Sequence, residues 1–276
     1  MKIGIIGLGL IGGSLGLGLS RLKLIENISG MDISPANEKK ALELGIVQKI
    51  LPLEELLSSC DLLFIATPVD SIISLLPRLE LAPKTLSIVE LGSTKASTKS
   101  ALPESLAAQT ILAHPMAGTE NSGPGAAFLG LYQNAVCVLC NTSVTAREHL
   151  DRAITLLSYL GMSIVFMHSK EHDEHVALIS HLPHAMSFAL ANCVLKKEQR
   201  ENILHLAGGS FRDMSRIAKS SPAMWTSIFK QNKKNLLEAI FGFEAEMAIL
   251  KQLMSDEDWE GVAAWMKEAN GLREIL

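Results

Sequence analysis

The sequence has few cysteines, and their placement argues against the usual cysteine chemistries. Of the four, only Cys137 and Cys140 form a C-x-x-C pair, and no second pair accompanies them as a zinc site would require. Residues 135–139 have the pattern of a strand, so we expect these two thiols to be buried and free rather than redox-active. No targeting segment is evident, and a reducing cytoplasm fits this cysteine usage.

The sequence also lacks a strong charge of either sign. Lys and Arg number 25 against 29 Asp and Glu, a net charge of −4, which argues against nucleic acid as the main partner. Hydrophobic residues make up 48% and charged residues 20%, as in globular rather than disordered chains. A chain of 276 residues can bury a large core, and we expect two domains. Because the chain ends soon after the second domain, we expect no appended regulatory domain of usual size.

No charged side chain occurs between Lys2 and Arg21, a gap typical of signal peptides and membrane spans. Seven glycines lie in this interval, too many for a spanning helix, and no small-residue cleavage site follows. We therefore interpret the segment as a buried strand and helix, and we expect no membrane association.

This uncharged segment carries a dinucleotide-binding pattern. An apolar strand over residues 3–6 runs into Gly7, Gly9 and Gly12, the spacing G-x-G-x-x-G, and an apolar helix follows. Gly7 permits the turn, the missing Cβ of Gly9 lets a pyrophosphate approach, and Gly12 lets helix and strand pack closely. The helix N-terminus adds unpaired N–H groups that favour phosphate. The alternative is a purely structural glycine-rich turn.

Asp32 indicates which dinucleotide is bound. It belongs to a second apolar stretch, residues 28–33, about 20 residues beyond the glycines, where a carboxylate can accept hydrogen bonds from a ribose 2′-hydroxyl. The same charge would repel a 2′-phosphate. The sequence therefore predicts NAD rather than NADP as the cofactor.

Strand and helix patterns alternate up to residue 167, and no strand pattern follows. We predict an α/β Rossmann-type doubly wound sheet over residues 1–167, followed by an all-α domain over 168–276. Ligands of such sheets lie beyond the carboxyl ends of the strands, which places Ala66, Thr67 and Pro68 at the cofactor cleft. The helices expected in the second domain are 170–197, 200–207, 212–219, 222–250 and 256–271.

The predicted helical domain is rich in apolar side chains. A surface of this kind cannot all face one small core, which predicts a homodimer formed through this domain. The alternative is that these residues fill the core of the monomer. The residues concerned are Phe229, Leu236, Leu237, Ile240, Phe241, Phe243, Met247 and Leu250.

Four of the eight histidines crowd one helical stretch. Helical spacing places His172 with His175, and His181 with His184, on shared faces. Neutral imidazoles suit zinc, but no H-E-x-x-H occurs and Pro183 interrupts the second pair, so we expect no metal. A nicotinamide enzyme has another use for histidine, as a base of near-neutral pKa that removes a hydroxyl proton.

Six motifs are spread over nearly the whole chain. They are G-L-G-L-I-G-G-S at 7–14, A-T-P at 66–68, G-S-T-K at 92–95, H-P-M-A-G-T-E at 114–120, S-H-L-P-H at 180–184 and the run from 208 to 225. With these motifs the chain resembles the prephenate/arogenate dehydrogenase family of tyrosine biosynthesis. H-P-M-A-G-T-E, and R-I-A followed by P-x-M-W, are the most discriminating motifs. Two departures, Glu90 for the usual Asp and Ala96 for the usual Gly, lie outside the expected reacting groups.

The resemblance implies an enzyme that uses NAD for the oxidative decarboxylation of prephenate to 4-hydroxyphenylpyruvate. It implies that His114, which follows a predicted strand, is the catalytic acceptor for the ring hydroxyl. Ser93 would hydrogen-bond the same hydroxyl or the nicotinamide region and help to orient His114. In the glycine loop, Leu10 and Ile11 join the expected cofactor contacts.

The resemblance also implies a set of substrate contacts. Arg216 is the candidate for a substrate carboxylate, because its planar fork can bind two oxygens at once. His184 matches the family histidine that contacts substrate from the helical domain, and Glu120 and Trp225 are expected to close the pocket. We interpret Arg212 as a structural residue.

Several alternatives stay open at this point. The substrate could be arogenate, or the enzyme could accept both acids as a cyclohexadienyl dehydrogenase. Further alternatives are a non-catalytic NAD-sensing dimer and a hydroxyacid or imine oxidoreductase of similar plan. His172 and Asp173 could be functional or could form a network that joins the two domains. We expect His149 to lie on an exposed helix.

Overall fold

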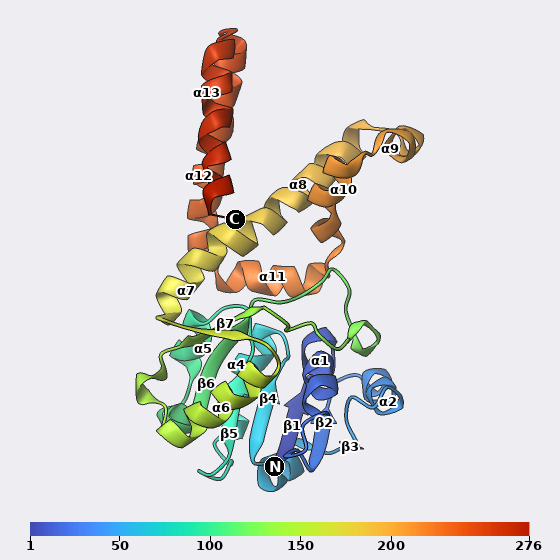
Figure 1. The fold of residues 1–276 in the computed structure, drawn as a ribbon, viewed down its shortest axis with the longest axis vertical. Coiled ribbons are helices and arrows are strands. Elements are labelled where there is room, and N and C mark those ends of the chain that lie inside the picture. The colour runs from blue at the N-terminus through green and yellow to red at the C-terminus, as the bar shows by residue number, and fades with distance from the viewer. Residues whose placement is uncertain (276) are drawn as a thin grey trace.

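A computed structural model describes residues 1–275 and shows a sheet-containing part followed by a helical part (Figure 1). The sheet ends with β8 (Ser163–Met167), and the helices of the second part begin with α7 (Ser169–Val176). The predicted fold class, a Rossmann-type α/β sheet followed by an all-α domain, is confirmed.

Eight strands form one sheet in the order β3-β2-β1-β4-β5-β6-β7-β8. All neighbouring strands run parallel except β6 and β7, which are antiparallel. β4 and β5 are buried at every position, as expected of central strands covered on both faces. The remaining bounds are β1 (Lys2–Ile6), β2 (Asn27–Met31), β3 (Lys49–Ile50), β4 (Leu62–Ile65), β5 (Ser87–Glu90), β6 (Thr110–Pro115) and β7 (Val136–Cys140).

Helices cover both faces of the sheet, and each face has its own hydrophobic core. Leu15 of α1 and Leu156 of α6 belong to one core. Leu56 of α3 and Ile72 of α4 belong to the other. The helices of this part are α1 (Leu10–Leu19), α2 (Pro35–Glu43), α3 (Leu53–Ser59), α4 (Val69–Leu79), α5 (Ala96–Ala101) and α6 (Arg147–Tyr159).

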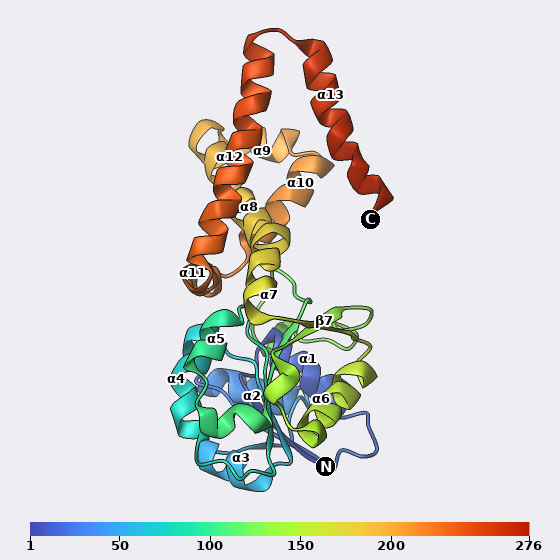
Figure 2. The same ribbon diagram turned by 90° about the vertical axis from the view of Figure 1, so that its left-hand side faces the viewer.

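The helical part splits into two arms above the sheet. In Figure 1, α8 to α10 form one arm, α12 and α13 form the other, and α11 lies across the carboxyl ends of the strands. Figure 2 shows that α12 and α13 diverge from a shared turn. The bounds are α8 (Leu182–Lys197), α9 (Arg200–Leu206), α10 (Gly209–Arg216), α11 (Pro222–Gln231), α12 (Lys233–Ser255) and α13 (Trp259–Ala269).

Two of the predicted helices are interrupted close to the candidate site described below. The helix predicted over 170–197 contains a π-helical turn, Ala177–His181, directly before α8. Pro183 lacks the N–H that a regular α-helix would need there, and the wider turn accommodates it. The helix predicted over 222–250 is divided at Asn232, whose backbone (φ −110°, ψ 29°) leaves the helical region. The single-helix prediction for 222–250 was therefore wrong.

His149 is buried, so the interpretation of its helix as exposed was wrong at this position. Its side chain lies on the face of α6 that packs on the sheet, one and two turns before Ala153 and Leu156. Its Nδ1 lies 2.8 Å from the Oγ of Ser87, a hydroxyl that also accepts from Arg152 at 2.9 Å. Burial lowers the pKa of the His149 imidazole.

We predict that the buried His149 lowers the free energy of unfolding at acidic pH. Because its pKa in the folded protein lies below its ordinary value, the unfolded chain binds the proton more readily. The free energy of unfolding should therefore fall as pH drops from roughly 7.5 to 5.5, through the ordinary histidine pKa. Denaturant unfolding of wild type and His149→Asn at both pH values measures this, and the variant should lose less stability. Equal losses in the two proteins would contradict the prediction.

Candidate active site

A cavity of about 540 Å³ lies between the carboxyl ends of the strands and the helices α8 and α11. Three of the predicted cofactor residues, Gly7, Gly12 and Asp32, do not line this cavity. Most of the predicted site residues line it: Gly9, Leu10, Ile11, Ala66, Thr67, Pro68, Ser93, His114, Glu120, His184, Arg216 and Trp225.

The three glycines of the loop differ in what a side chain would meet. Gly7 has a φ of +92°, and a Cβ there would lie 2.7 Å from the carbonyl oxygen of Ala66. At Gly12 a Cβ would lie 1.9 Å from the carbonyl oxygen of Gly7. A Cβ at Gly9 would meet no protein atom within 4 Å. Gly7 and Gly12 therefore serve the turn and the packing, whereas Gly9 keeps open the space at the N-terminus of α1.

The Asp32 carboxylate lies just beyond β2 and is held by backbone and side-chain donors. Its Oδ2 accepts from the N–H of Leu8 at 2.8 Å, which fixes the glycine loop beside it. Its Oδ1 accepts from the N–H of Ser34 at 2.9 Å and from Asn37 Nδ2 at 3.1 Å. The side chain that follows, Ile33, is fully exposed (101%). An oriented acceptor next to an exposed apolar side chain fits the ribose and adenine of a dinucleotide.

His114 belongs to a chain of three side chains at the bottom of the cavity. Its Nδ1 lies 2.8 Å from Nε2 of His172, and Nδ1 of His172 lies 2.8 Å from Oδ1 of Asp173. The same carboxylate accepts from the backbone N–H groups of Lys95, at 2.8 Å, and Ala96, at 2.9 Å. Asp173 therefore joins the helical part to the turn after β5.

The donors and acceptors of this chain determine which nitrogen of His114 is free. A carboxylate only accepts, so Nδ1 of His172 carries a proton and its Nε2 accepts. His114 must then donate from Nδ1, which leaves a lone pair on its Nε2. His114 lines the cavity, so this arrangement presents a base to a bound substrate. The predicted partner that orients His114 was Ser93, but the structure places His172 in that position.

Burial keeps His114 unprotonated. It lowers the pKa of His114 well below its usual value, and the neighbouring His172, Lys95 and His181 lower it further. His172 also has a lowered pKa, again chiefly from burial, although its bond to Asp173 acts in the opposite direction. A base in this state is available to accept a proton at neutral pH.

A buried ion pair lies behind His114. Lys95 and Glu90 are both fully buried and form a salt bridge. The Lys95 ammonium also donates to the carbonyl oxygen of Ala113 at 2.7 Å, directly before His114. The pair thus ties the end of β5 to β6. Glu90, the departure from the family pattern noted in the sequence, supports the site without lining the cavity.

Arg216 and Glu120, both predicted to serve the substrate, form an ion pair at the cavity wall. Nη1 of Arg216 lies 3.0 Å from Oε2 of Glu120. The Arg216 side chain is 56% exposed, so its other guanidinium donors are accessible to an anion. Arg212 instead donates from Nε to the carbonyl oxygen of Ala207, as its structural interpretation suggested.

Trp225 forms an aromatic wall with His184. The two rings stack with centroids 3.6 Å apart. The helix that carries Trp225, α11, is fastened to the start of α4 because the Asp70 carboxylate accepts from Ser227 at 3.1 Å and from Gln231. Since α4 directly follows Pro68 of the cofactor cleft, this contact relates the two sides of the cavity.

Cys137 and Cys140 are free and buried in the sheet, as predicted. Burial raises the pKa of each thiol to about 12, so neither is a thiolate at neutral pH. Among residues 1–275 no cluster of three or more potential metal ligands occurs.

The sequence analysis gave no role in the site to His181 or Asn232. His181 lines the cavity, and Asn232, which lies outside the lining, contacts His181 from the break between α11 and α12. The histidine spacing did single out His181, but no local pattern marks a donor that comes from a residue 51 positions away.

A Rossmann-type sheet with a glycine loop at its switch point, and a cavity that is lined by His114 and by residues of a second, helical part, are features of a nucleotide-binding dehydrogenase. Residues 15–166 match the family model "Prephenate dehydrogenase, nucleotide-binding domain", and residues 168–268 match "Prephenate dehydrogenase, dimerization domain". The chain belongs to the prephenate dehydrogenase family, which confirms the resemblance seen in its motifs.

Relatives match along nearly the whole chain. A prephenate dehydrogenase of Bacillus subtilis is 32% identical over 98% of this chain and 74% of its own length. A cyclohexadienyl dehydrogenase of Zymomonas mobilis is 30% identical over 99% of this chain and 95% of its own. The crystal structure of a prephenate dehydrogenase from A. aeolicus in complex with hydroxyphenyl propionate and NAD+ superposes with a TM-score of 0.90. It is 31% identical and covers 99% of this chain and 97% of that one.

We predict that alanine at Gly9 and at Gly12 has separable effects. Gly12→Ala should lower the thermal unfolding midpoint, because its Cβ overlaps the carbonyl of Gly7. Gly9→Ala should leave that midpoint nearly unchanged yet weaken NAD binding about tenfold or more, because the methyl fills the phosphate space. Thermal unfolding without cofactor and titration with NAD measure the two effects. Native NAD affinity in Gly9→Ala would show that the phosphates lie elsewhere.

Proposed function

We propose that this protein catalyses the NAD-dependent oxidative decarboxylation of prephenate to 4-hydroxyphenylpyruvate in tyrosine biosynthesis. The observation that carries the proposal is the free Nε2 of His114, held by His172 and Asp173 in a cavity shared with the glycine loop. Family membership supports the substrate, since relatives with the same two domains carry the name prephenate dehydrogenase.

NAD fits the residues present. Gly9 would admit the pyrophosphate, Asp32 would accept from the adenosine ribose, and exposed Ile33 would contact the adenine. Ala66, Thr67 and Pro68 would line the path toward the nicotinamide. When bound, NAD would accept the hydride from the ring carbon that carries the hydroxyl.

The protein's part in the reaction is to hold the substrate and receive a proton. Nε2 of His114 takes the hydroxyl proton, and the bonds through His172 to Asp173 stabilise the imidazolium that forms. The substrate loses a hydride and, as CO₂, its ring carboxylate. The electron pair left by decarboxylation makes the ring an aromatic phenolate, which takes the proton back from His114 to give the hydroxyl of the product. Ser93, which lines the cavity at the end of β5, would hold the hydroxyl or the nicotinamide.

The substrate is a dianion and needs cationic or donor groups. Arg216 would bind one carboxylate with the donors that Glu120 leaves free. His184 and Trp225 would form the wall against which the substrate ring lies, and Glu120 would close the cavity mouth by holding Arg216.

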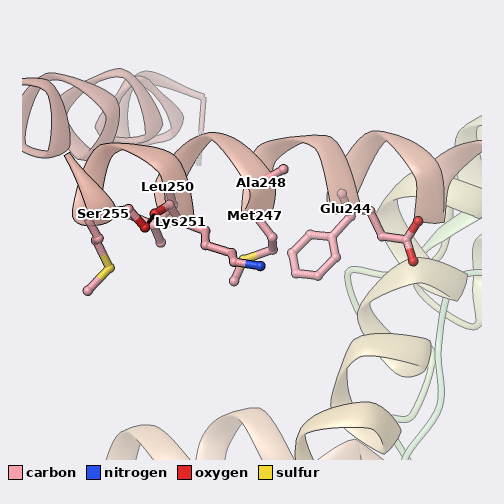
Figure 3. Close-up of a pocket in the computed structure, with 8 residues that line it drawn as sticks. Glu244, Met247, Ala248, Leu250, Lys251 and Ser255 are labelled. Atoms are coloured by element: carbon pink, nitrogen blue, oxygen red, sulfur yellow. Dashed lines mark hydrogen bonds between the residues drawn. The ribbon is translucent and has the colours of Figure 1, made fainter.

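The helical domain would form a homodimer. A groove of about 650 Å³ lies along one side of α12. Figure 3 shows Met247 and neighbouring side chains of α12 that line this groove. Phe241 (64% exposed), Met247 (45%) and Met254 (53%) leave a large apolar surface uncovered in one chain. The matched family model for this region is that of a dimerization domain.

We propose the division 1–167 for the NAD-binding domain and 168–276 for the substrate and dimerisation domain, of which Leu276 lies outside the described residues. We place the protein in the cytoplasm. The stretch Ser169–Lys197 is long and apolar enough to cross a membrane by length and composition, with 11% of its apolar 18-residue window buried in one chain. The buried histidine network of α7 and the expected dimer contact give this apolar stretch a role outside a membrane.

Arogenate is the second candidate substrate, and the cyclohexadienyl dehydrogenase among the relatives favours an enzyme that accepts both acids. A spectrophotometric assay with NAD and NADP against prephenate and arogenate decides between these possibilities. NADH formed with prephenate supports the proposal. Faster turnover of arogenate would move the assignment to that acid, and absence of NADH from either would favour a non-catalytic NAD-sensing dimer.

We predict that His114→Asn loses turnover but keeps substrate binding. Asparagine removes the base, and a positioned acid or base typically contributes about 10²–10⁴-fold to the rate. Steady-state kinetics should show kcat reduced by that factor, while KM for prephenate stays near the wild-type value. A variant with near-native kcat would show that another group takes the proton.

We predict that Arg216→Ala chiefly raises KM. Loss of a charge-assisted hydrogen bond to a carboxylate should raise KM for prephenate roughly 10- to 100-fold with little change in kcat. Arg212→Ala is the matched control, because Arg212 lies on the same helix and outside the cavity lining. If the two variants showed the same KM, Arg216 would not bind the carboxylate.

A further inference from the structure

The cavity contains a second buried histidine that the proposed mechanism does not use. His181 is 1% exposed and lines the cavity from the π turn before α8. Its Nε2 is buried and has no hydrogen-bond partner among residues 1–275. A buried polar atom without a partner in a substrate cavity points to a group that a ligand satisfies.

The other nitrogen of His181 is occupied. Nδ1 lies 3.2 Å from Nδ2 of Asn232, which also lies 2.6 Å from the backbone carbonyl oxygen of Asp173. A carbonyl only accepts, so the amide atom facing it must be the NH₂ group; the opposite orientation would bring two oxygens together. Oδ1 of Asn232 correspondingly accepts from Asn235 at 2.8 Å. Asn232 is 3% exposed, so no solvent competes for these bonds.

The tautomer of His181 follows from this arrangement. Because Asn232 donates to Nδ1, a neutral His181 carries its proton on Nε2. Burial lowers the pKa of His181 to about 4, with Asp173 acting against the shift and His172 and His184 adding to it. The ring therefore stays neutral at physiological pH, with a donor at Nε2.

His184 has the opposite arrangement. Its Nδ1 lies 2.9 Å from the carbonyl oxygen of Ser180 and must donate, so its neutral ring has an acceptor at Nε2. The cavity thus has one neutral histidine that presents a donor and one that presents an acceptor. An acceptor oxygen of the substrate can bind the donor of His181, whereas neutral His184 offers that oxygen a lone pair.

We propose that Asn232 is a positioning residue that fixes His181 in the Nε2–H tautomer, so that His181 donates a hydrogen bond to a carboxylate or carbonyl oxygen of the substrate. The assignment rests on the proposed function for the identity of that substrate. It also explains the break between α11 and α12, because the non-helical backbone at Asn232 places its amide between His181 and Asp173.

The tautomer is tested without substrate. Nitrogen NMR of protein labelled with ¹⁵N-histidine should show His181 with a protonated Nε2 and an unprotonated Nδ1, assigned by loss of the signals in His181→Gln. Asn232→Asp replaces the donor by an acceptor and should move the proton to Nδ1 if the variant folds. A wild-type His181 protonated at Nδ1 would overturn the inference whatever the enzyme's substrate.

The contact with substrate is tested by kinetics on prephenate. His181→Leu should raise KM roughly 10- to 100-fold with little change in kcat, whereas His181→Gln, which keeps a side-chain N–H, should recover most of the loss. His175→Gln is the matched control, because His175 is an exposed histidine of the neighbouring helix. Native KM in His181→Leu would overturn the inference. Inactivity of wild type on prephenate would instead refute the proposed function and leave the tautomer result standing.

Discussion

The structure depends on one carboxylate, that of Asp173, at the junction of its two parts. It accepts from the backbone N–H groups of Lys95 and Ala96 and from Nδ1 of His172, while the carbonyl oxygen of the same residue accepts from Asn232. Asp173 is 2% exposed, so these bonds form in the protein interior, where a polar group without a hydrogen-bond partner is costly. The sheet, α7 and the start of α12 are thereby held in one arrangement around the cavity.

Fixed acceptors determine the protonation of the whole histidine cluster. The side chain of Asp173 fixes His172, and through it His114, with a free lone pair facing the cavity. Its backbone carbonyl fixes the amide of Asn232 and, through it, the donor of His181. These assignments follow from the acceptors alone, because carboxylates and carbonyls can only accept. In the proposed mechanism the site therefore presents a base and a donor that are already oriented before substrate arrives, and such preorganisation lowers the cost of reaching a transition state.

The two parts of the chain are stabilised in different ways. The sheet is covered on both faces by large hydrophobic cores, so its strand ends can hold His114 and the buried Glu90–Lys95 pair rigidly. The helices α8 to α13 bury few side chains, among them Trp225 and Leu236, and leave much apolar surface exposed. Such a surface needs another protein surface to cover it, which is why the helical part suits a subunit contact and the sheet suits the chemistry.

The fold class, the glycine loop with Asp32, and the position of His114 after a strand could all be predicted from the amino-acid sequence. These features are local, since strand and helix periods and turn glycines can be recognised within a few residues. Three other features become known only from the packed chain: His172 rather than Ser93 holds His114, Asn232 divides a helix to reach His181, and His149 is buried. Those outcomes depend on partners 58, 51 and 62 positions away, and the donor and acceptor matching that selects them exists only once the chain is packed.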